Sequence, residues 1–346
     1  MKKFKVLLYE QMAEAGTCLL EQNCRLVYAK SLDEENLIQE ARNADAIVIR
    51  ANGRISKAII DAGQRLKVIG RHGVGVENID IEAATNRGIW VVNTPEANTE
   101  SVAEHAVGLI ITLSKRILEA DEAIRQGRFE VRYEYLGQEI LGKTLGIIGL
   151  GRIGSRVAEI CHTAFKMKVI YYDEVSRSQV AKRIGARSVP FEEILKAADY
   201  LSLHIPSTPK THHFIGKREL RLMKRSAFLI NTSRGAIVDE AALLQALKEG
   251  GIKGAGLDVY EEEPTSKDNP LFRLPNVVAT PHMAAHTHEA LAAMSLVAED
   301  VVRVLSGKSP KYPVNQVNLQ QTADGATPPA CPAEEKAKST KCRRQN

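Results

Sequence analysis

Aromatic residues and long apolar runs are both scarce in this 346-residue chain. Phe, Trp and Tyr together make up 5% of it, and there is a single Trp. No apolar stretch approaches the ~20 residues that a membrane-spanning helix needs. The N-terminal MKKFKVLLYE contains too short an apolar run for a secretory signal peptide. We therefore expect no membrane partner.

The chain also has few cysteines, and they follow no pattern. The five lack the spacing of a zinc site or of a disulfide framework: Cys18, Cys24, Cys161, Cys331 and Cys342. An odd number of dispersed cysteines is typical of a reducing compartment. The sequence thus predicts a cytoplasmic protein without a metal site.

A strong charge imbalance is missing as well. The 47 basic and 42 acidic residues leave a net charge of +5, and part of this excess lies in the final KAKSTKCRRQN. No compact basic patch is visible, so the sequence does not predict a nucleic-acid partner. With 44% hydrophobic residues, the chain is long enough to form two globular domains.

What the chain does contain is a regular alternation of strand-like and helix-like segments. Five short apolar runs occur before residue 95, and six more follow Lys143: FKVLLYE, CRLVYA, DAIVIR, LKVIGRHG, IWVVN, then LGIIGL, KVIYYD, YLSLHI, FLINT, IKGAGLDV and NVVATP. Amphipathic helical segments separate them. This alternation predicts an α/β protein with parallel sheets, the second of them the size of a Rossmann dinucleotide-binding domain.

Two longer helical segments suggest how these sheets are connected. Residues 97–127 keep a helical period for five turns, with a capping-box spacing at Ser101 and Glu104. We predict one long helix there, linking the two domains. The segment THEALAAMSLVAEDVVRVLSG is predicted to return to the N-terminal half.

The predicted domains follow from this connectivity. Residues 1–98 and 287–315 would form a discontinuous domain, and residues 99–286 would form the Rossmann domain. From residue 316 to 346 aliphatic residues almost disappear, so this tail is predicted to be disordered.

The most informative short motif is GLGRIG at residues 149–154, between the strand LGIIG and the helix RIGSRVAEICHTAF. Gly149 would permit a tight turn, and Gly151 would let the backbone approach a pyrophosphate at the helix N-terminus. Gly154 would let the helix pack close to the strand. The next strand ends in Asp173, placed to accept hydrogen bonds from an adenosine ribose. This arrangement predicts NAD binding, and Arg177 is the one nearby residue that blurs the preference over NADP.

Three later segments place reactive side chains where strands end. NTSRG carries Arg234, DVYEEEP carries Asp258 and Glu263, and TPHMAAHT carries His282. Ligands bind at the carboxyl ends of parallel strands. Arg234 is suited to a substrate carboxylate, and His282 to taking a hydroxyl proton while Glu263 orients its ring. His286 and His288 are alternative proton carriers.

Taken in order, these motifs resemble those of the NAD-dependent D-2-hydroxyacid dehydrogenases, a family that includes phosphoglycerate dehydrogenase and the glyoxylate/hydroxypyruvate reductases. GRHGVGVENID and NTPEANTESVAEHAVGLI match two further family segments, and the resemblance covers about residues 4–315. It implies two Rossmann-like doubly wound domains, a discontinuous flavodoxin-like substrate domain and a central NAD-binding domain. It also implies a homodimer joined through the NAD-binding domains.

The resemblance further implies a role for each site residue. The catalytic residues would be Arg234, Glu263 and His282, with Arg234 holding the substrate carboxylate and carbonyl. The substrate would also meet the N–H groups of Val74 and Gly75, and Arg50 would lie nearby. Further cofactor contacts would come from residues beside the pyrophosphate and the nicotinamide: Arg152, Ile153, Thr232, Ser233, Arg234, Asp258 and His282. Asp258 would contact the carboxamide.

The departures from the family pattern concern the substrate. His72 and His286 stand where many members carry smaller residues, and with Arg50 they either recognise a second anionic group, such as phosphate, or only support the site. The substrate therefore stays open between 3-phosphoglycerate and hydroxypyruvate or glyoxylate. The chain ends before the regulatory domain of many phosphoglycerate dehydrogenases, so serine feedback of that type is not expected.

A different class of function is compatible with the same motifs. Some proteins of this fold are NAD-sensing corepressors that bind peptides and keep the same Arg, Glu and His. The chain shows no extended docking insertion, which favours the enzyme. A formate dehydrogenase is less favoured, because members of that branch of the family carry a glutamine at the position of Glu263.

Overall fold

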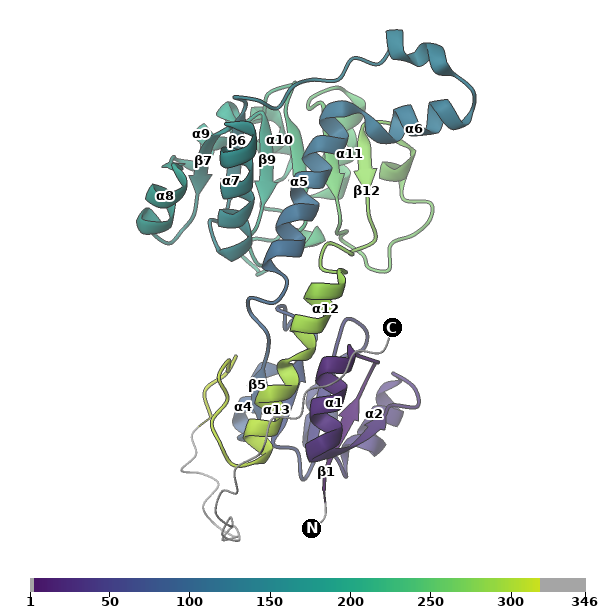
Figure 1. Ribbon diagram of the computed structural model, residues 1–346, viewed down its shortest axis with the longest axis vertical. Coiled ribbons are helices and arrows are strands. Elements are labelled where there is room, and N and C mark those ends of the chain that lie inside the picture. Colours follow the sequence, from purple (N-terminus) through teal and green to yellow (C-terminus); the bar gives the residue numbers. More distant parts are fainter. Residues whose placement is uncertain (1–2, 318–346) are drawn as a thin grey trace, which may run out of the picture.

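The computed structural model describes residues 3–317, which form two parallel β-sheets (Figure 1). The first sheet has the strand order β2-β1-β3-β4-β5, the flavodoxin-like order. Its strands are β1 (Phe4–Leu8), β2 (Cys24–Tyr28), β3 (Ala46–Ile49), β4 (Val68–Arg71) and β5 (Trp90–Val92). Between them run α1 (Glu14–Asn23), α2 (Glu34–Ala41), α3 (Lys57–Ala62) and α4 (Ile81–Asn86).

The second sheet has seven parallel strands in the order β12-β11-β10-β9-β6-β7-β8. This is the Rossmann order with one strand added at the end. The strands are β6 (Thr144–Ile148), β7 (Lys168–Tyr172), β8 (Arg187–Ser188), β9 (Tyr200–Leu203), β10 (Phe228–Asn231), β11 (Gly254–Leu257) and β12 (Val277–Ala279). Its helices are α7 (Arg152–Phe165), α8 (Ser178–Ile184), α9 (Phe191–Ala197), α10 (Lys217–Leu222) and α11 (Glu240–Lys248), with short 3-10 turns η2 (Gly235–Ile237) and η3 (Pro270–Arg273).

The strands are buried because helices cover both faces of each sheet. In the second sheet, α5 (Thr99–Lys115) and α7 cover one face, where Ile110, Leu145 and Val157 share a core. On the other face, Leu201 and Leu229 pack beneath α9, α10 and α11. Strands covered on both sides must be apolar at nearly every position, which explains the continuous apolar runs in the sequence. The predicted fold class is confirmed.

The last helices return to the first sheet. The segments α12 (His288–Ser295) and α13 (Val297–Leu305) pack on α1, and α13 also lies against β4 and β5. Val297 and Val301 of α13 share a core with Val6 and Val48 of the first sheet. We call the first sheet, α1–α4, α12 and α13 the N-terminal unit, and the second sheet with α5 and α7–α11 the central unit. Apart from residues 316 and 317, the predicted disordered tail lies outside the described residues.

Several local predictions were wrong. The expected long helix breaks at Arg116, whose φ of 54° is left-handed, and continues as α6 (Ile117–Arg125). No capping box forms at Ser101, because α5 begins at Thr99 and the Ser101 hydroxyl bonds Thr287 instead, at 2.6 Å. The short edge strand β8 was not predicted, and the final helix is two helices that meet at Leu296.

Candidate active site

The three glycines of the GLGRIG turn have three different surroundings. Gly149 has φ +90°, and a Cβ there would lie 2.6 Å from the His204 carbonyl oxygen. A Cβ on Gly154 would lie 2.1 Å from the Gly149 carbonyl, so this glycine is what lets α7 pack against the turn. Gly151 differs from both, since its Cβ would meet nothing within 4 Å. The open side of the turn is therefore at Gly151, at the N-terminus of α7.

Asp173 follows β7 directly and lies beside this turn. Its Oδ2 accepts a hydrogen bond from the Leu150 N–H at 2.9 Å, and its Oδ1 accepts one from the Val175 N–H at 2.9 Å. Arg177 donates from Nε to Oδ2 at 3.1 Å. The carboxylate is thus held next to the glycine turn, with one guanidinium already paired to it.

These features fit a dinucleotide. The open Gly151 and the helix N-terminus behind it suit a pyrophosphate, and the buried Thr232 hydroxyl, just past β10, has no hydrogen-bond partner among the described residues. Arg152 and Ile153 form the first turn of α7; the Arg152 side chain is exposed and lies 3.3 Å from Glu96.

A histidine–carboxylate pair lies at the carboxyl ends of β11 and β12. His282 Nδ1 and Glu263 Oε2 are 2.6 Å apart, and the Tyr260 N–H donates to Glu263 Oε1 at 3.0 Å. Burial alone would raise the pKa of Glu263, but the bonds from His282 and Tyr260 and the charge of Arg234 outweigh it and lower that pKa. Glu263 is therefore a carboxylate at neutral pH, facing the imidazole. Neither His286 nor His288 has such a partner among the described hydrogen bonds.

The backbone of His282 is held by Asp258. His282 has φ 51°, and its N–H donates to the Asp258 carbonyl at 2.7 Å. The Asp258 carboxylate is fully buried and accepts bonds from the Thr280 hydroxyl at 2.6 Å and from the N–H groups of Met283 and Ala284, each at 2.9 Å. In this structure Asp258 fixes the loop that carries His282. Its contact with a nicotinamide carboxamide stays a prediction.

Arg234 extends from the turn after β10 toward the N-terminal unit. Its Nε donates to Glu77 Oε1 at 2.9 Å, its Nη2 to Glu77 Oε2 at 3.3 Å, and its Nη1 to the Ser233 carbonyl at 2.7 Å. Buried Asn231 holds the turn itself: its amide accepts from the Ser233 N–H and hydroxyl and donates to the Arg234 carbonyl at 2.9 Å. The guanidinium thus lies where the two units meet.

The loop after β4 faces Arg234. No hydrogen bond within residues 3–317 uses the N–H groups of Val74 and Gly75, so both are free to bind an anion. Arg71 donates from Nε to the Gly75 carbonyl at 2.7 Å and also bonds the His72 carbonyl. Burial, with the nearby charge of Arg50, lowers the pKa of His72 to about 4. His72 is therefore neutral at physiological pH.

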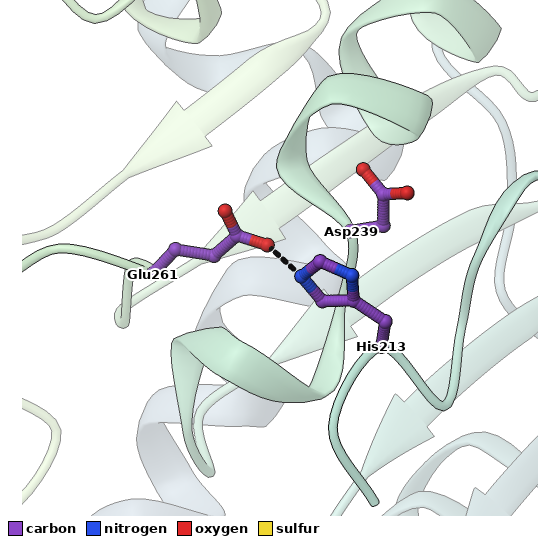
Figure 2. Close-up of side chains that lie close together, drawn as sticks. All are labelled: His213, Asp239 and Glu261. Atoms are coloured by element: carbon purple, nitrogen blue, oxygen red, sulfur yellow. Dashed lines mark hydrogen bonds and ion pairs between the residues drawn. The ribbon is translucent and has the colours of Figure 1, made fainter.

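A second cluster supports the loop that carries Glu263 (Figure 2). His213 Nε2 lies 2.5 Å from Glu261 Oε1, and Asp239 lies beside them. Asp239 also caps α11 through the Ala242 N–H at 2.8 Å, and the Glu261 N–H donates to Glu240 at 2.7 Å. One donor atom from each of the three residues lies within 4.8 Å of the others. The contacts in the structure are those of a histidine–carboxylate hydrogen bond and a helix cap that tie three loops together.

Sequence reasoning missed several residues of this site. Glu77, Asn231 and Tyr260 hold Arg234 and Glu263, and Thr280 bonds Asp258 while lying 2.9 Å from the His105 ring. The only available signal was that all five lie in quoted motifs: GVGVENID, NTPEANTESVAEHAVGLI, NTSRG, DVYEEEP and TPH. Their partners are up to 175 residues away, so no local spacing indicates them.

Fold and site together define a dinucleotide-binding protein with an acid–base pair. Residues 107–284 match the family described as D-isomer specific 2-hydroxyacid dehydrogenase, NAD binding domain. A glyoxylate reductase of Thermococcus litoralis is 43% identical over 324 residues, which cover 91% of this chain and 97% of that protein. The chain belongs to the D-2-hydroxyacid dehydrogenase family, and its cofactor is a nicotinamide dinucleotide.

Two further relatives show the range of the family. The D-3-phosphoglycerate dehydrogenase of Methanocaldococcus jannaschii is 43% identical over 327 residues, 94% of this chain. The chain spans only 62% of that relative's length, and 60% of the Archaeoglobus fulgidus enzyme of the same name. The crystal structure of a glyoxylate reductase from Paecilomyes thermophila superposes with a TM-score of 0.82 and 31% identity, covering 91% of this chain and 99% of that one. Within residues 3–317, no helix is long and apolar enough to cross a membrane.

Proposed function

We propose that this protein interconverts a D-2-hydroxy acid and its 2-keto acid, with Arg234, Glu263 and His282 as the catalytic residues. The observation that carries the proposal is the His282–Glu263 pair at 2.6 Å, close enough to Arg234 for the arginine charge to lower the pKa of Glu263. In this proposal the proton carrier and the carboxylate binder lie at the same edge of the parallel sheet as the open Gly151 turn.

The chemistry follows from these positions. The bound dinucleotide supplies hydride in reduction and accepts it in oxidation. His282 gives a proton to the carbonyl oxygen in reduction and takes it back from the hydroxyl in oxidation. Glu263, as a carboxylate on Nδ1, stabilises the protonated imidazole and leaves Nε2 for the substrate. Arg234 binds the substrate carboxylate together with the free N–H groups of Val74 and Gly75.

The charges around the site favour a small 2-keto acid, such as glyoxylate or hydroxypyruvate, over a phosphorylated one. Arg71 is engaged by two backbone carbonyls and His72 is neutral. Arg50 remains as a cation for a second anionic group, and its Nη1 already donates to the Gln11 carbonyl at 2.5 Å. His286 is exposed, and its ring makes no hydrogen bond or ion pair within residues 3–317.

For the cofactor we propose NAD in preference to NADP. Asp173 is fixed beside the glycine turn, where its charge would repel a 2′-phosphate. Ser233, Thr232 and Asp258 would lie on the nicotinamide side, and Arg152 and Ile153 against the pyrophosphate. A titration of initial rate with NADH and then NADPH tests this preference directly.

The decisive experiment is a panel of 2-keto acids assayed with NADH: glyoxylate, hydroxypyruvate and 3-phosphohydroxypyruvate. Turnover of the first two with a higher kcat/KM than the third supports the proposal. Turnover of the phosphorylated acid alone would instead favour phosphoglycerate dehydrogenase activity, with Arg50 as the phosphate contact. The absence of any turnover would contradict the proposed activity and favour the corepressor alternative. The names of these relatives do not support that alternative.

We also propose that the protein acts as a homodimer in the cytoplasm. The arm formed by α6 and η1 (Phe129–Tyr133) projects away from the central unit (Figure 1). The arm and the residues that follow it carry several apolar side chains exposed to solvent: Ile117, Leu118, Ile124, Phe129, Tyr133, Leu136 and Leu141. Such a patch is typical of a protein interface.

A further inference from the structure

Glu77 contacts Arg234 across the junction of the two units, and the proposed chemistry gives Glu77 no role. It lies in the loop between β4 and α4 of the N-terminal unit, whereas Arg234 belongs to the central unit. Two parallel hydrogen bonds, at 2.9 and 3.3 Å, join the carboxylate to the Nε and Nη2 edge of the guanidinium. A bidentate pair fixes the plane of the guanidinium as well as its distance.

The loop that carries Glu77 is itself fixed. The Asn78 amide donates to the carbonyls of Arg50 at 3.3 Å and Gly53 at 3.2 Å. The Ile55 N–H donates to the Asn78 carbonyl at 2.8 Å, and Ile55 pairs with Ile79 in a parallel bridge. Glu77 therefore presents its carboxylate from a well-held backbone.

The approach of Arg234 also depends on a glycine. A Cβ on Gly75 would lie 2.0 Å from Arg234 Nη2 and 2.4 Å from Glu77 Oε2. A side chain at this position would displace the pair from its present arrangement. The same Gly75 carries one of the two free N–H groups, so the pair lies directly beside the proposed carboxylate site.

The charges explain why the pair is needed. Arg71 and Arg234 lie near each other, and after burial the charge of Arg234 is the largest influence lowering the pKa of Arg71, to about 10. Although burial would raise the pKa of Glu77, Arg234 and Arg71 lower it. Glu77 thus stays ionised and offsets the repulsion between the two guanidinium groups. Without its charge, Arg234 would turn away from Arg71.

We infer that Glu77 is a positioning residue, which holds the Arg234 guanidinium across the junction of the two units so that its free N–H groups meet the substrate carboxylate. This inference rests on the proposed function. The alternative role for Glu77 is competition with the substrate for Arg234. A competing carboxylate would weaken substrate binding, so its removal would lower KM.

The sign of the change in KM therefore decides the matter. Glu77→Gln keeps the size of the side chain and removes its charge. We expect KM for glyoxylate to rise and kcat to fall, so that kcat/KM drops roughly tenfold to a hundredfold, the scale of a misplaced binding group. The Kd for NADH should stay within about twofold, because Glu77 lies outside the dinucleotide turn. Glu77→Asp, which keeps the charge, should recover part of the loss.

Glu100→Gln is the matched control. Arg156 donates from Nε and Nη2 to Glu100 at 2.7 and 2.8 Å, the same arrangement on the surface of the central unit. This variant should behave as wild type. An unchanged or lowered KM in Glu77→Gln, or an Asp variant no better than the Gln variant, would overturn the inference. If wild type and Glu100→Gln themselves show no turnover with glyoxylate, hydroxypyruvate or 3-phosphohydroxypyruvate, the proposed function fails, and the inference with it.

Discussion

At the scale of single residues, the candidate site includes a histidine held in an unusual backbone conformation. His282 has φ 51°, a value uncommon for a residue with a side chain. Its N–H bond to Asp258, together with the three bonds that the Asp258 carboxylate accepts, holds the loop in this conformation. Conformational strain of this kind is often found at functional sites. Here its consequence is that the imidazole faces Glu263.

His282→Ala should lower turnover roughly a hundredfold or more, the usual contribution of a positioned proton donor. The Kd for NADH should change little, because the alanine variant keeps the backbone bond to Asp258. His286→Ala is the control and should retain near wild-type turnover. If instead His286→Ala abolishes turnover and His282→Ala does not, His286 is the proton carrier.

Glu263→Gln should retain much of the activity but shift its pH dependence. The pKa of Glu263 is lowered, so its negative charge is present across neutral and alkaline pH and stabilises the protonated imidazole. Without that charge the imidazole loses its proton at lower pH. The alkaline limb of the keto-acid reduction profile should therefore move down by about one pH unit or more. Glu262→Gln, a neighbouring exposed residue, should leave the limb in place; a Glu263→Gln profile that matches it would refute the assignment.

Asp173→Ser should shift the cofactor preference toward NADP. The substitution removes a charge that repels the 2′-phosphate and frees Arg177, now 3.1 Å from Oδ2, to bind it. The ratio of kcat/KM for NADPH to that for NADH should rise roughly tenfold or more, the scale of one charge-assisted hydrogen bond. Adding Arg177→Ala should reverse part of this gain. Equal efficiency of both cofactors in the wild type would contradict the premise.

At the scale of elements, the chain near its described end completes the first sheet. Pro313 pairs with Val92 in an antiparallel bridge, and the Val314 N–H donates to the Val91 carbonyl at 2.7 Å. Asn315 is buried; its Oδ1 accepts from the Val91 N–H, and its Nδ2 donates to Thr85 and Ile89. This segment belongs to the folded N-terminal unit.

Asn315→Ala should therefore reduce the free energy of unfolding by about 1–3 kcal/mol, the cost of leaving buried polar groups unpaired. Asn276→Ala, at a half-buried asparagine whose side chain makes one bond to the Lys253 carbonyl, should have a smaller effect in the same denaturant titration. Truncation after Val317 should leave stability and NADH affinity unchanged, because the removed residues, 318–346, have almost no aliphatic side chains to bury. Loss of NADH affinity in the truncated chain would show that the tail contributes.

At the scale of the whole molecule, the apolar arm indicates how two chains would associate. Tyr133 and Leu136 are 77% and 79% exposed, and Phe129 is 63% exposed. Lysines at Phe129 and Tyr133 should convert a dimer to a monomer in sedimentation velocity, because charges would be buried at the interface. Tyr28→Lys, at an exposed residue of β2 in the first sheet, is the control and should leave the dimer intact. A wild-type monomer at micromolar concentration would contradict the proposed association.

Much of this protein was determined by its sequence alone. The apolar runs and amphipathic periods predict both parallel sheets, because strand burial on two faces and helix burial on one are local patterns. The places of Gly149, Gly151 and Gly154 in a strand–turn–helix were also predictable. The placement of Arg234, Glu263 and His282 at one edge of the sheet was predictable as well, because each lies within six residues of a strand end.

Only the tertiary structure decided the rest. It pairs Arg234 with Glu77 across 157 residues, brings Glu263 to the ring of His282, and buries the carboxylate of Asp258. It also breaks the linking helix at Arg116, whose side chain stacks on Tyr135 at 4.1 Å. No local sequence pattern predicts these contacts, because each joins separate segments of the central unit or, for Arg234 and Glu77, the two units.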